Sequence, residues 1–220
     1  MSVKHAPAQA LTKMNEGFYD NDPLDPGGET IWGIARNRPP SNTRAQHLWS
    51  LIWARVDNRR GDEGFPLCLR EDTQILGWSD EIYLIEWWNP LKPDYYPEDA
   101  QPIANRVYDV TVNMGPTWGT RFMQQALNRL GNNGEHWREL DESGEHGADG
   151  LMGPVSSEAL HACFEKFGTG IANVVLGDAM KLQQIARREY LVGRNRDLNR
   201  YLRGWIARDL RDTGAVEATV

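Results

Sequence analysis

The chain has few cysteines and no long hydrophobic run, and each shortage excludes a class of protein. Its 220 residues include two cysteines, Cys68 and Cys163, with no CxxC pair, so a disulfide framework has no support. No stretch approaches the ~18 to 20 apolar residues of a membrane span. The first residues, MSVKHAPAQALTKM, lack the apolar core of a signal peptide. We therefore expect synthesis in the cytoplasm without a signal peptide, and no insertion into a membrane.

Basic residues are also in short supply, which argues against nucleic-acid binding. Lysine and arginine number 24 against 31 aspartates and glutamates, a formal net charge of -7. The exception is residues 187–211, with Arg187, Arg188, Arg194, Arg196, Arg200, Arg203, Arg208 and Arg211. Three acidic residues interrupt this run, which favours a solvated, salt-bridged helix face; the alternative is a patch that contacts an anionic cell wall. The five histidines show no metal-ligand spacing, so we expect no metal and no cofactor.

The hydrophobic pattern predicts a mainly α-helical protein. Apolar residues recur at helical spacing over about 7–16, 43–58, 80–88, 103–113, 116–130, 154–167, 171–192 and 198–210, and no alternating strand pattern is sustained. A short hairpin is expected around 30–34. The segment 89–102 holds four prolines and predicts an extended connector. We place the boundary there, with a first region over 1–100 and a second, helical region over 101–220 packed against it.

Most of the chemical detail lies between Asn15 and Ile34. Glu16 is followed directly by Gly17, a residue favoured just past the end of a helix. A turn-rich loop follows, with the pairs Asp22-Pro23, Asp25-Pro26 and Gly27-Gly28, and then Thr30. One carboxyl group on a rigid helix end, facing further carboxylates on a constrained loop, suits acid-assisted cleavage of a glycosidic bond. Turn formation alone remains the alternative for both aspartates.

This order of residues resembles glycoside hydrolase family 108. The family's N-terminal signature is a Glu-Gly-Gly-Tyr step, then Asn-Asp-Pro, Asp-Pro-Gly-Gly, Thr and Tyr/Trp-Gly-Ile. The corresponding steps here are Glu16-Gly17-Phe18-Tyr19, Asn21-Asp22-Pro23, Asp25-Pro26-Gly27-Gly28, Thr30 and Trp32-Gly33-Ile34, with Phe18 in place of the second glycine. The constellation is also similar to the Glu, Asp, Thr set of phage-type lysozymes, although the interval from Asp25 to Thr30 is one residue shorter.

The second half resembles the predicted peptidoglycan-binding region that members of this family often carry. Its recognisable steps are matched by Tyr108-Asp109, Asn113-Met114-Gly115-Pro116, Asp149-Gly150-Leu151-Met152-Gly153-Pro154 and Gly204-Trp205-Ile206-Ala207-Arg208. The Asp149 turn is expected to be a helix entry in preference to a ligand site. Asp109 and Asn113, four residues apart, suit a tie to a neighbouring helix as well as a contact with sugar.

The resemblance implies a lysozyme-like fold and an N-acetylmuramidase of the endolysin kind. Glu16 would protonate the leaving oxygen of the β-1,4 bond between N-acetylmuramic acid and N-acetylglucosamine. Asp25 would stabilise the developing positive charge or orient the attacking water, and Thr30 would hold that water; analogy tilts toward inversion. Asp22 is the alternative second carboxylate. Further candidate contacts with the glycan strand are Phe18, Tyr19, Trp32 and Asn113.

Two other functions stay open at this point. One is a wall-binding or virion structural protein that keeps the fold without catalysis. The other is a lytic transglycosylase, which also needs one acidic residue but leaves 1,6-anhydro sugar ends. We expect a monomer that reaches the cell wall through a holin, through lysis or as part of a particle.

Overall fold

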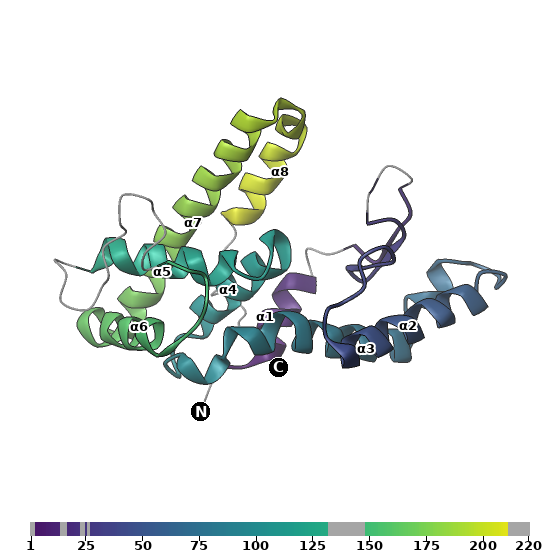
Figure 1. Ribbon diagram of the computed structural model, residues 1–220, viewed down its shortest axis with the longest axis horizontal. Helices are drawn as coiled ribbons and strands as arrows, with labels where there is room; N and C mark the ends of the chain where they lie inside the picture. Colours follow the sequence, from purple (N-terminus) through teal and green to yellow (C-terminus); the bar gives the residue numbers. More distant parts are fainter. Residues whose placement is uncertain (1–2, 14–16, 23–24, 26, 132–147, 211–220) are drawn as a thin grey trace. The chain divides into compact units, whose positions relative to one another are not determined.

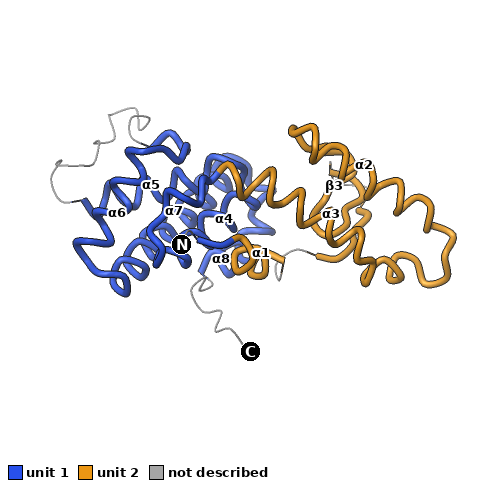
Figure 2. The backbone as a smooth tube through the Cα atoms, turned by 90° about the horizontal axis from the view of Figure 1, so that it is seen from below, with its two compact units in different colours: residues 1–4, 91–220 blue, residues 5–90 orange. Residues whose placement is uncertain are grey.

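The computed structural model describes residues 3–13, 17–22, 25, 27–131 and 148–210 (Figure 1). The chain forms two compact units, coloured separately in Figure 2. One holds residues 5–90, and the other holds residues 1–4 together with 91–220. The break therefore falls between Pro90 and Leu91, at the start of the proline-rich segment. The assignment of separate functions to residues 1–100 and 101–220 stays a prediction.

The unit of residues 5–90 combines helices with one small sheet. Its elements are α1 (His5–Lys13), β1 (Tyr19–Asp20), β2 (Thr30–Ile31), β3 (Ile34–Ala35), α2 (Thr43–Asn58) and α3 (Thr73–Tyr83). The α3 helix continues as a wider helical turn over Leu84–Trp88. The expected helix over 43–58 is confirmed, whereas the helix expected over 80–88 begins earlier, because Asp72 caps it by accepting hydrogen bonds from the amides of Gln74 and Ile75.

Helix α2 supplies the main apolar face of this unit. Asn42 caps its N-terminus, its side chain accepting from the amides of Arg44 and Ala45. Leu48, Ile52 and Val56 of α2 are buried, as their helical spacing predicts. The opposing apolar residues come from α3 and the sheet: Ile75, Ile82, Ile31 and Ile34. The sheet thus packs on this unit through the buried Ile31 and Ile34, and its other residues remain at least partly accessible.

The unit that includes residues 91–220 is a helical assembly around α4. Its helices are α4 (Gln101–Met114), α5 (Trp118–Leu130), α6 (Pro154–Phe167), α7 (Thr169–Arg194) and α8 (Asn199–Asp209). All residues of α4 from Ile103 to Thr111 are buried, because α5 and α7 both pack on it. The connector expected as extended over 89–102 instead contains single helical turns at Asn89–Leu91 and Pro93–Tyr95.

One glycine sets the contact between α4 and α5. A Cβ atom at Gly119 would lie 2.1 Å from the carbonyl oxygen of Val107 and 2.4 Å from the Thr111 hydroxyl. Only a residue without a side chain allows two helix backbones to approach so closely. Together, the helices and the single small three-stranded sheet of the described residues confirm the mainly α class with a small hairpin segment.

Candidate active site

Glu16, the predicted acid, lies outside the described residues, as do Pro23 and Pro26. The structure describes the site from Gly17 onward, including the sheet and most of the loop. Its other predicted members, Asp22, Asp25 and Thr30, are all described.

A tight turn shapes the hairpin between β2 and β3. Ile31 pairs with Ile34, and the two residues between them, Trp32 and Gly33, both have positive φ, at 49° and 76°. Two-residue hairpin turns need this left-handed backbone because it matches the twist of the strands. Glycine adopts it readily, whereas a tryptophan in this region is strained. The strain falls at the tip of the hairpin that carries Thr30.

The register of the sheet places an unexpected carboxylate beside Thr30. Asp20 of β1 lies opposite Thr30, which in turn lies opposite Ala35 of β3. Directly opposed residues share a face, with Cβ atoms about 4.5 to 5.5 Å apart. Asp20 is exposed, and it has no ion-pair partner among the residues that the structure describes. The sequence offered no signal for this pairing, since Asp20 stands outside the Asp-Pro pairs.

Asp25 is an exposed residue whose carboxylate closes the turn that follows it. Its Oδ1 accepts a hydrogen bond from the amide of Gly27 at 2.7 Å, and its carbonyl accepts from the amide of Gly28 at 2.8 Å. The amide of Asp25 in turn donates to the carbonyl of Asp22 at 3.0 Å. Asp25 therefore stabilises the turn through Oδ1, and its other carboxylate oxygen remains available for catalysis.

The backbone of this loop continues the β2–β3 pairing. The amide of Asn37 donates to the carbonyl of Gly27 at 3.0 Å. Gly28 has a φ of 68°, and a Cβ there would come within 2.5 Å of the Asn37 side chain. The Thr30 hydroxyl donates to the Gly28 carbonyl at 3.2 Å, which leaves its oxygen lone pairs as acceptors. Gly27 and Gly28 thus act through their backbone, which positions Asp25 next to the sheet.

Glu29, between this loop and β2, is a buried carboxylate that the sequence interpretation missed. It is 7% exposed, and its Oε1 accepts from the Tyr19 hydroxyl at 2.5 Å. Its Oε2 accepts from Arg36 Nη1 at 2.7 Å and also from Arg60. Burial by itself would raise the pKa of Glu29, but the hydrogen bonds from Arg60, Tyr19 and Arg36 outweigh it and hold that pKa below its ordinary value. Glu29 is a fixed anion.

The two arginines complete a closed set of charges. Arg36 also pairs with Asp57, and Nε of Arg60 donates to Oδ1 of Asp57 at 2.9 Å. Each guanidinium therefore bridges the same two carboxylates, and the set has no net charge. We call Glu29, Arg36, Asp57 and Arg60 the charge ring. Its members lie 7, 21 and 3 positions apart along the chain, a spacing that shows no motif.

Comparison with protein families identifies one segment of the chain. Residues 10–115 match the model of a protein family described as Glycosyl hydrolase 108. This segment is a glycosyl hydrolase 108 domain. The chain therefore carries a glycoside hydrolase domain, as the motif order predicted. The match ends at residue 115, so the resemblance of residues 116–220 to a peptidoglycan-binding region stays a prediction.

A solved structure shares the fold. The "Structure of Brucella abortus SagA" superimposes with a TM-score of 0.51 and is 19% identical; the match covers 94% of this chain and 90% of that chain. At that identity the likeness concerns the fold alone. The search of curated proteins found no match to this sequence.

Four aromatic residues of the glycosyl hydrolase 108 domain form two ring pairs at the sheet. The Phe18 ring lies 5.0 Å from the Trp32 ring in an edge-on arrangement, and the Tyr19 ring lies 5.7 Å from Phe65. Nε1 of Trp32 is buried and has no hydrogen-bond partner among the residues that the structure describes. The hydroxyl of Tyr19 donates its proton to Glu29, which leaves the ring and the hydroxyl oxygen available for other contacts. The roles of Tyr19 and Trp32 in binding a glycan stay predictions.

Asn113, near the end of the glycosyl hydrolase 108 domain, lies in the other compact unit. Its amide group donates to the carbonyl of Asp109 at 2.9 Å, one turn earlier in α4. The Asp109 carboxylate accepts from Nη2 of Arg208 at 3.1 Å. The pair Asp109 and Arg208 thus ties α4 to α8. Sugar binding by Asn113 stays a prediction.

The Asp149 turn beyond the domain is a helix entry, as expected. The amide of Gly150 donates to Oε1 of Gln124 at 2.8 Å, while Nε2 of Gln124 donates to Oδ1 of Asp149 at 2.8 Å. Gly150 has a φ of 82°, and a Cβ there would lie 2.5 Å from the carbonyl oxygen of Thr117. The turn is therefore fastened to α5, and Pro154 begins α6 directly after it.

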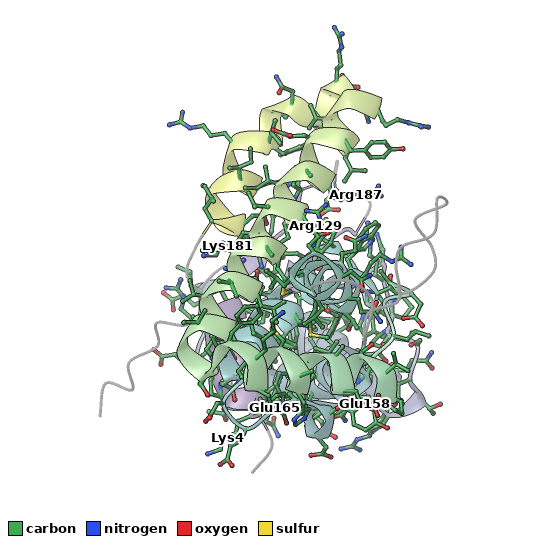
Figure 3. All side chains as sticks on the ribbon, turned by 90° about the vertical axis from the view of Figure 1, so that its left-hand side faces the viewer. Lys4, Arg129, Glu158, Glu165, Lys181 and Arg187 are labelled. Atoms are coloured by element: carbon green, nitrogen blue, oxygen red, sulfur yellow. The ribbon has the colours of Figure 1, made fainter. Side chains whose placement is uncertain are left out.

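The arginine-rich segment forms the α7–α8 hairpin. In Figure 3, long side chains project from the part of this hairpin that lies above the labelled residues Lys181 and Arg187. Arg188 pairs with Asp209 at 3.2 Å and Arg208 pairs with Asp109 at 3.1 Å, but Arg188 and Asp209 are buried, so their pair is not part of the predicted solvated face. Three further arginines lie over aromatic rings: Arg187 over Trp118, Arg194 over Tyr190 and Arg200 over Tyr201. Arg211 lies outside the described residues.

Among the described residues, no group of three or more histidine, cysteine, aspartate or glutamate side chains is arranged to hold a metal ion. None of the described helices has both the length and the apolar character needed to cross a membrane.

Proposed function

We propose that the protein is an N-acetylmuramidase that hydrolyses the β-1,4 bond between N-acetylmuramic acid and N-acetylglucosamine in peptidoglycan. The observation that carries this proposal is the glycosyl hydrolase 108 match over residues 10–115, which contains the whole Glu16 to Ile34 series. On this proposal the chain acts on the wall after release through a holin, lysis or a particle.

Glu16 is the proposed general acid. A carboxyl group in this role must remain protonated near neutral pH, which requires burial or nearby negative charge. Asp20, Asp22 and Asp25 follow Glu16 within nine residues, so negative charge close to it in the chain is plentiful. Positioned acid catalysis contributes on the order of 10² to 10⁴ in rate. Replacement of Glu16 by glutamine keeps the size and removes the proton.

Asp25 is the proposed second carboxylate, and its turn contact allows a clean test. Its Oδ1 accepts from the Gly27 amide, an interaction that an asparagine oxygen can preserve. Asp25→Asn therefore removes charge with the turn intact, whereas Asp25→Ala removes both. If Asp25 stabilises the developing positive charge, both Asp25→Asn and Asp25→Ala lower kcat strongly. If it serves only the turn, Asp25→Asn resembles the wild type and Asp25→Ala does not.

The deciding experiment is digestion of purified peptidoglycan by the wild type and by Glu16→Gln, with the released fragments analysed by mass spectrometry. Reducing N-acetylmuramic acid ends from the wild type alone support the proposal. Anhydro ends identify a lytic transglycosylase instead. A folded wild type that binds the wall and releases nothing refutes catalysis and leaves a binding protein.

A further inference from the structure

The charge ring connects the β2–β3 hairpin to one helix end. Glu29 directly precedes β2 and Arg36 directly follows β3, so the two residues stand at the open end of the hairpin. Their backbones are also joined, because the Arg36 amide donates to the Glu29 carbonyl at 2.8 Å. Asp57 belongs to the last turn of α2, and Arg60 follows that helix. Both ends of the hairpin are therefore bonded to the same end of α2.

Glu29 has no oxygen left for a substrate. Its Oε1 is engaged by the Tyr19 hydroxyl of β1, and its Oε2 by the two arginines of the ring. The residue is 7% exposed, whereas the side chain of Asp57 is 45% exposed. Through Tyr19 and Arg36, Glu29 contacts residues of β1 and residues that flank β3. Glu29 is therefore bonded to residues in or next to all three strands.

We propose that Glu29 is a positioning residue of the active site: by anchoring the sheet and both ends of the β2–β3 hairpin to α2, it holds Thr30 and the Asp25 turn in place. Thr30 is the next residue in the chain, and its hydroxyl donates to Gly28, whose amide is bonded to the Asp25 carbonyl. A shift at Glu29 is therefore passed to both groups through one covalent step and two hydrogen bonds. The inference rests on the proposed function for what Thr30 and Asp25 do.

A merely structural carboxylate provides the matched control. Asp72 has a side chain 1% exposed and two arginine partners, Arg55 at 2.6 Å and Arg59 at 3.1 Å. It lies in the same compact unit, where it caps α3, and none of its hydrogen bonds involves the hairpin. Glu29→Gln and Asp72→Asn are each isosteric and each remove one buried negative charge. Both variants are expected to lower the unfolding temperature, because each leaves arginines with one carboxylate fewer.

The test compares both variants with the wild type in the full chain by two measurements. The first is hydrogen exchange of backbone amides in residues 27–37. The second is kcat and KM on soluble peptidoglycan fragments at a temperature where every variant is folded. We expect Glu29→Gln alone to speed exchange in 27–37 and to lower kcat by between about tenfold and a hundredfold, with KM within about twofold. Asp72→Asn should leave both measurements at their wild-type values.

A double variant separates charge balance from loss of contacts. Arg60→Gln in the Glu29→Gln background removes one cation as well as one anion, so the ring is neutral again. The kcat of the double variant should be higher than the value expected if the separate effects of Glu29→Gln and Arg60→Gln were additive in free energy.

Three results would overturn the proposal or its premise. Unchanged exchange in 27–37 in folded Glu29→Gln shows that Glu29 does not anchor the hairpin. Faster exchange with unchanged kcat shows that the hairpin does not position the site. If the wild type itself cleaves nothing, the proposed function is wrong, and the exchange comparison still decides whether Glu29 anchors the hairpin.

Discussion

Gly119 should be the most sensitive glycine of the helical unit. In Gly119→Ala the new Cβ would sit 2.1 Å from the Val107 carbonyl oxygen, whereas ordinary contact begins at 3.4 Å. The helices α4 and α5 must then separate locally by about 1 Å, because a backbone carbonyl cannot rotate aside as a side chain does. Overpacking of a core costs about 1 to 3 kcal/mol, and the upper end applies where backbone is the obstacle. The helix propensity of alanine returns about 1 kcal/mol.

The net expectation is a loss of about 2 kcal/mol in the free energy of unfolding. Gly204→Ala, in the middle of α8, is the matched control, since a Cβ there meets nothing within 4 Å. That variant should gain up to about 1 kcal/mol. The two alanine variants would then differ by about 3 kcal/mol, or on the order of 10 °C in unfolding temperature.

Urea titrations followed by far-UV circular dichroism, with thermal scans alongside, measure this difference in the full-length chain. Equal midpoints for Gly119→Ala and Gly204→Ala would refute the reasoning, because they would mean that α4 and α5 can separate without loss. A urea midpoint of Gly204→Ala below that of the wild type would also refute the reasoning, because a Cβ at that position meets nothing within 4 Å.

The other predictions concern buried charge and a buried amide. The pKa of Glu29 is lowered in the folded state. Its contribution to stability is therefore complete above its unfolded pKa and is lost as pH falls through the folded pKa. The urea midpoint should stay level from about pH 7 to 5 and drop below about pH 4. Glu29→Gln should flatten that drop; an identical slope in the variant would contradict the assignment. Asp209→Ala should cost about 3 to 5 kcal/mol, because it leaves the buried Arg188 without its partner, and limited proteolysis should then cleave within α8 first. Gln124→Ala should cost about 2 kcal/mol by freeing the buried Gly150 amide, which a urea midpoint equal to that of the wild type would disprove.

Local sequence patterns predicted most of the secondary structure. Helical spacing of apolar residues located α2, α6 and α7 to within a few residues, because each such helix buries one continuous face. Turn chemistry likewise predicted the hairpin around Thr30 to Ile34. The start of α3 was missed because its cap depends on Asp72, a residue in a segment with weak periodicity.

The sequence by itself also determined the family, since the ordered series from Glu16 to Ile34 needs no contact map to be recognised, and the match over residues 10–115 confirmed it. Only the tertiary structure decided what surrounds those residues. The pairing of Asp20 with Thr30 follows from strand register, and the charge ring joins Glu29 and Arg36 to Asp57 and Arg60 across a turn, a helix and a hairpin. Ion pairs of this kind depend on distance in space, and the chain brings such groups together only when α2 and the sheet pack against each other.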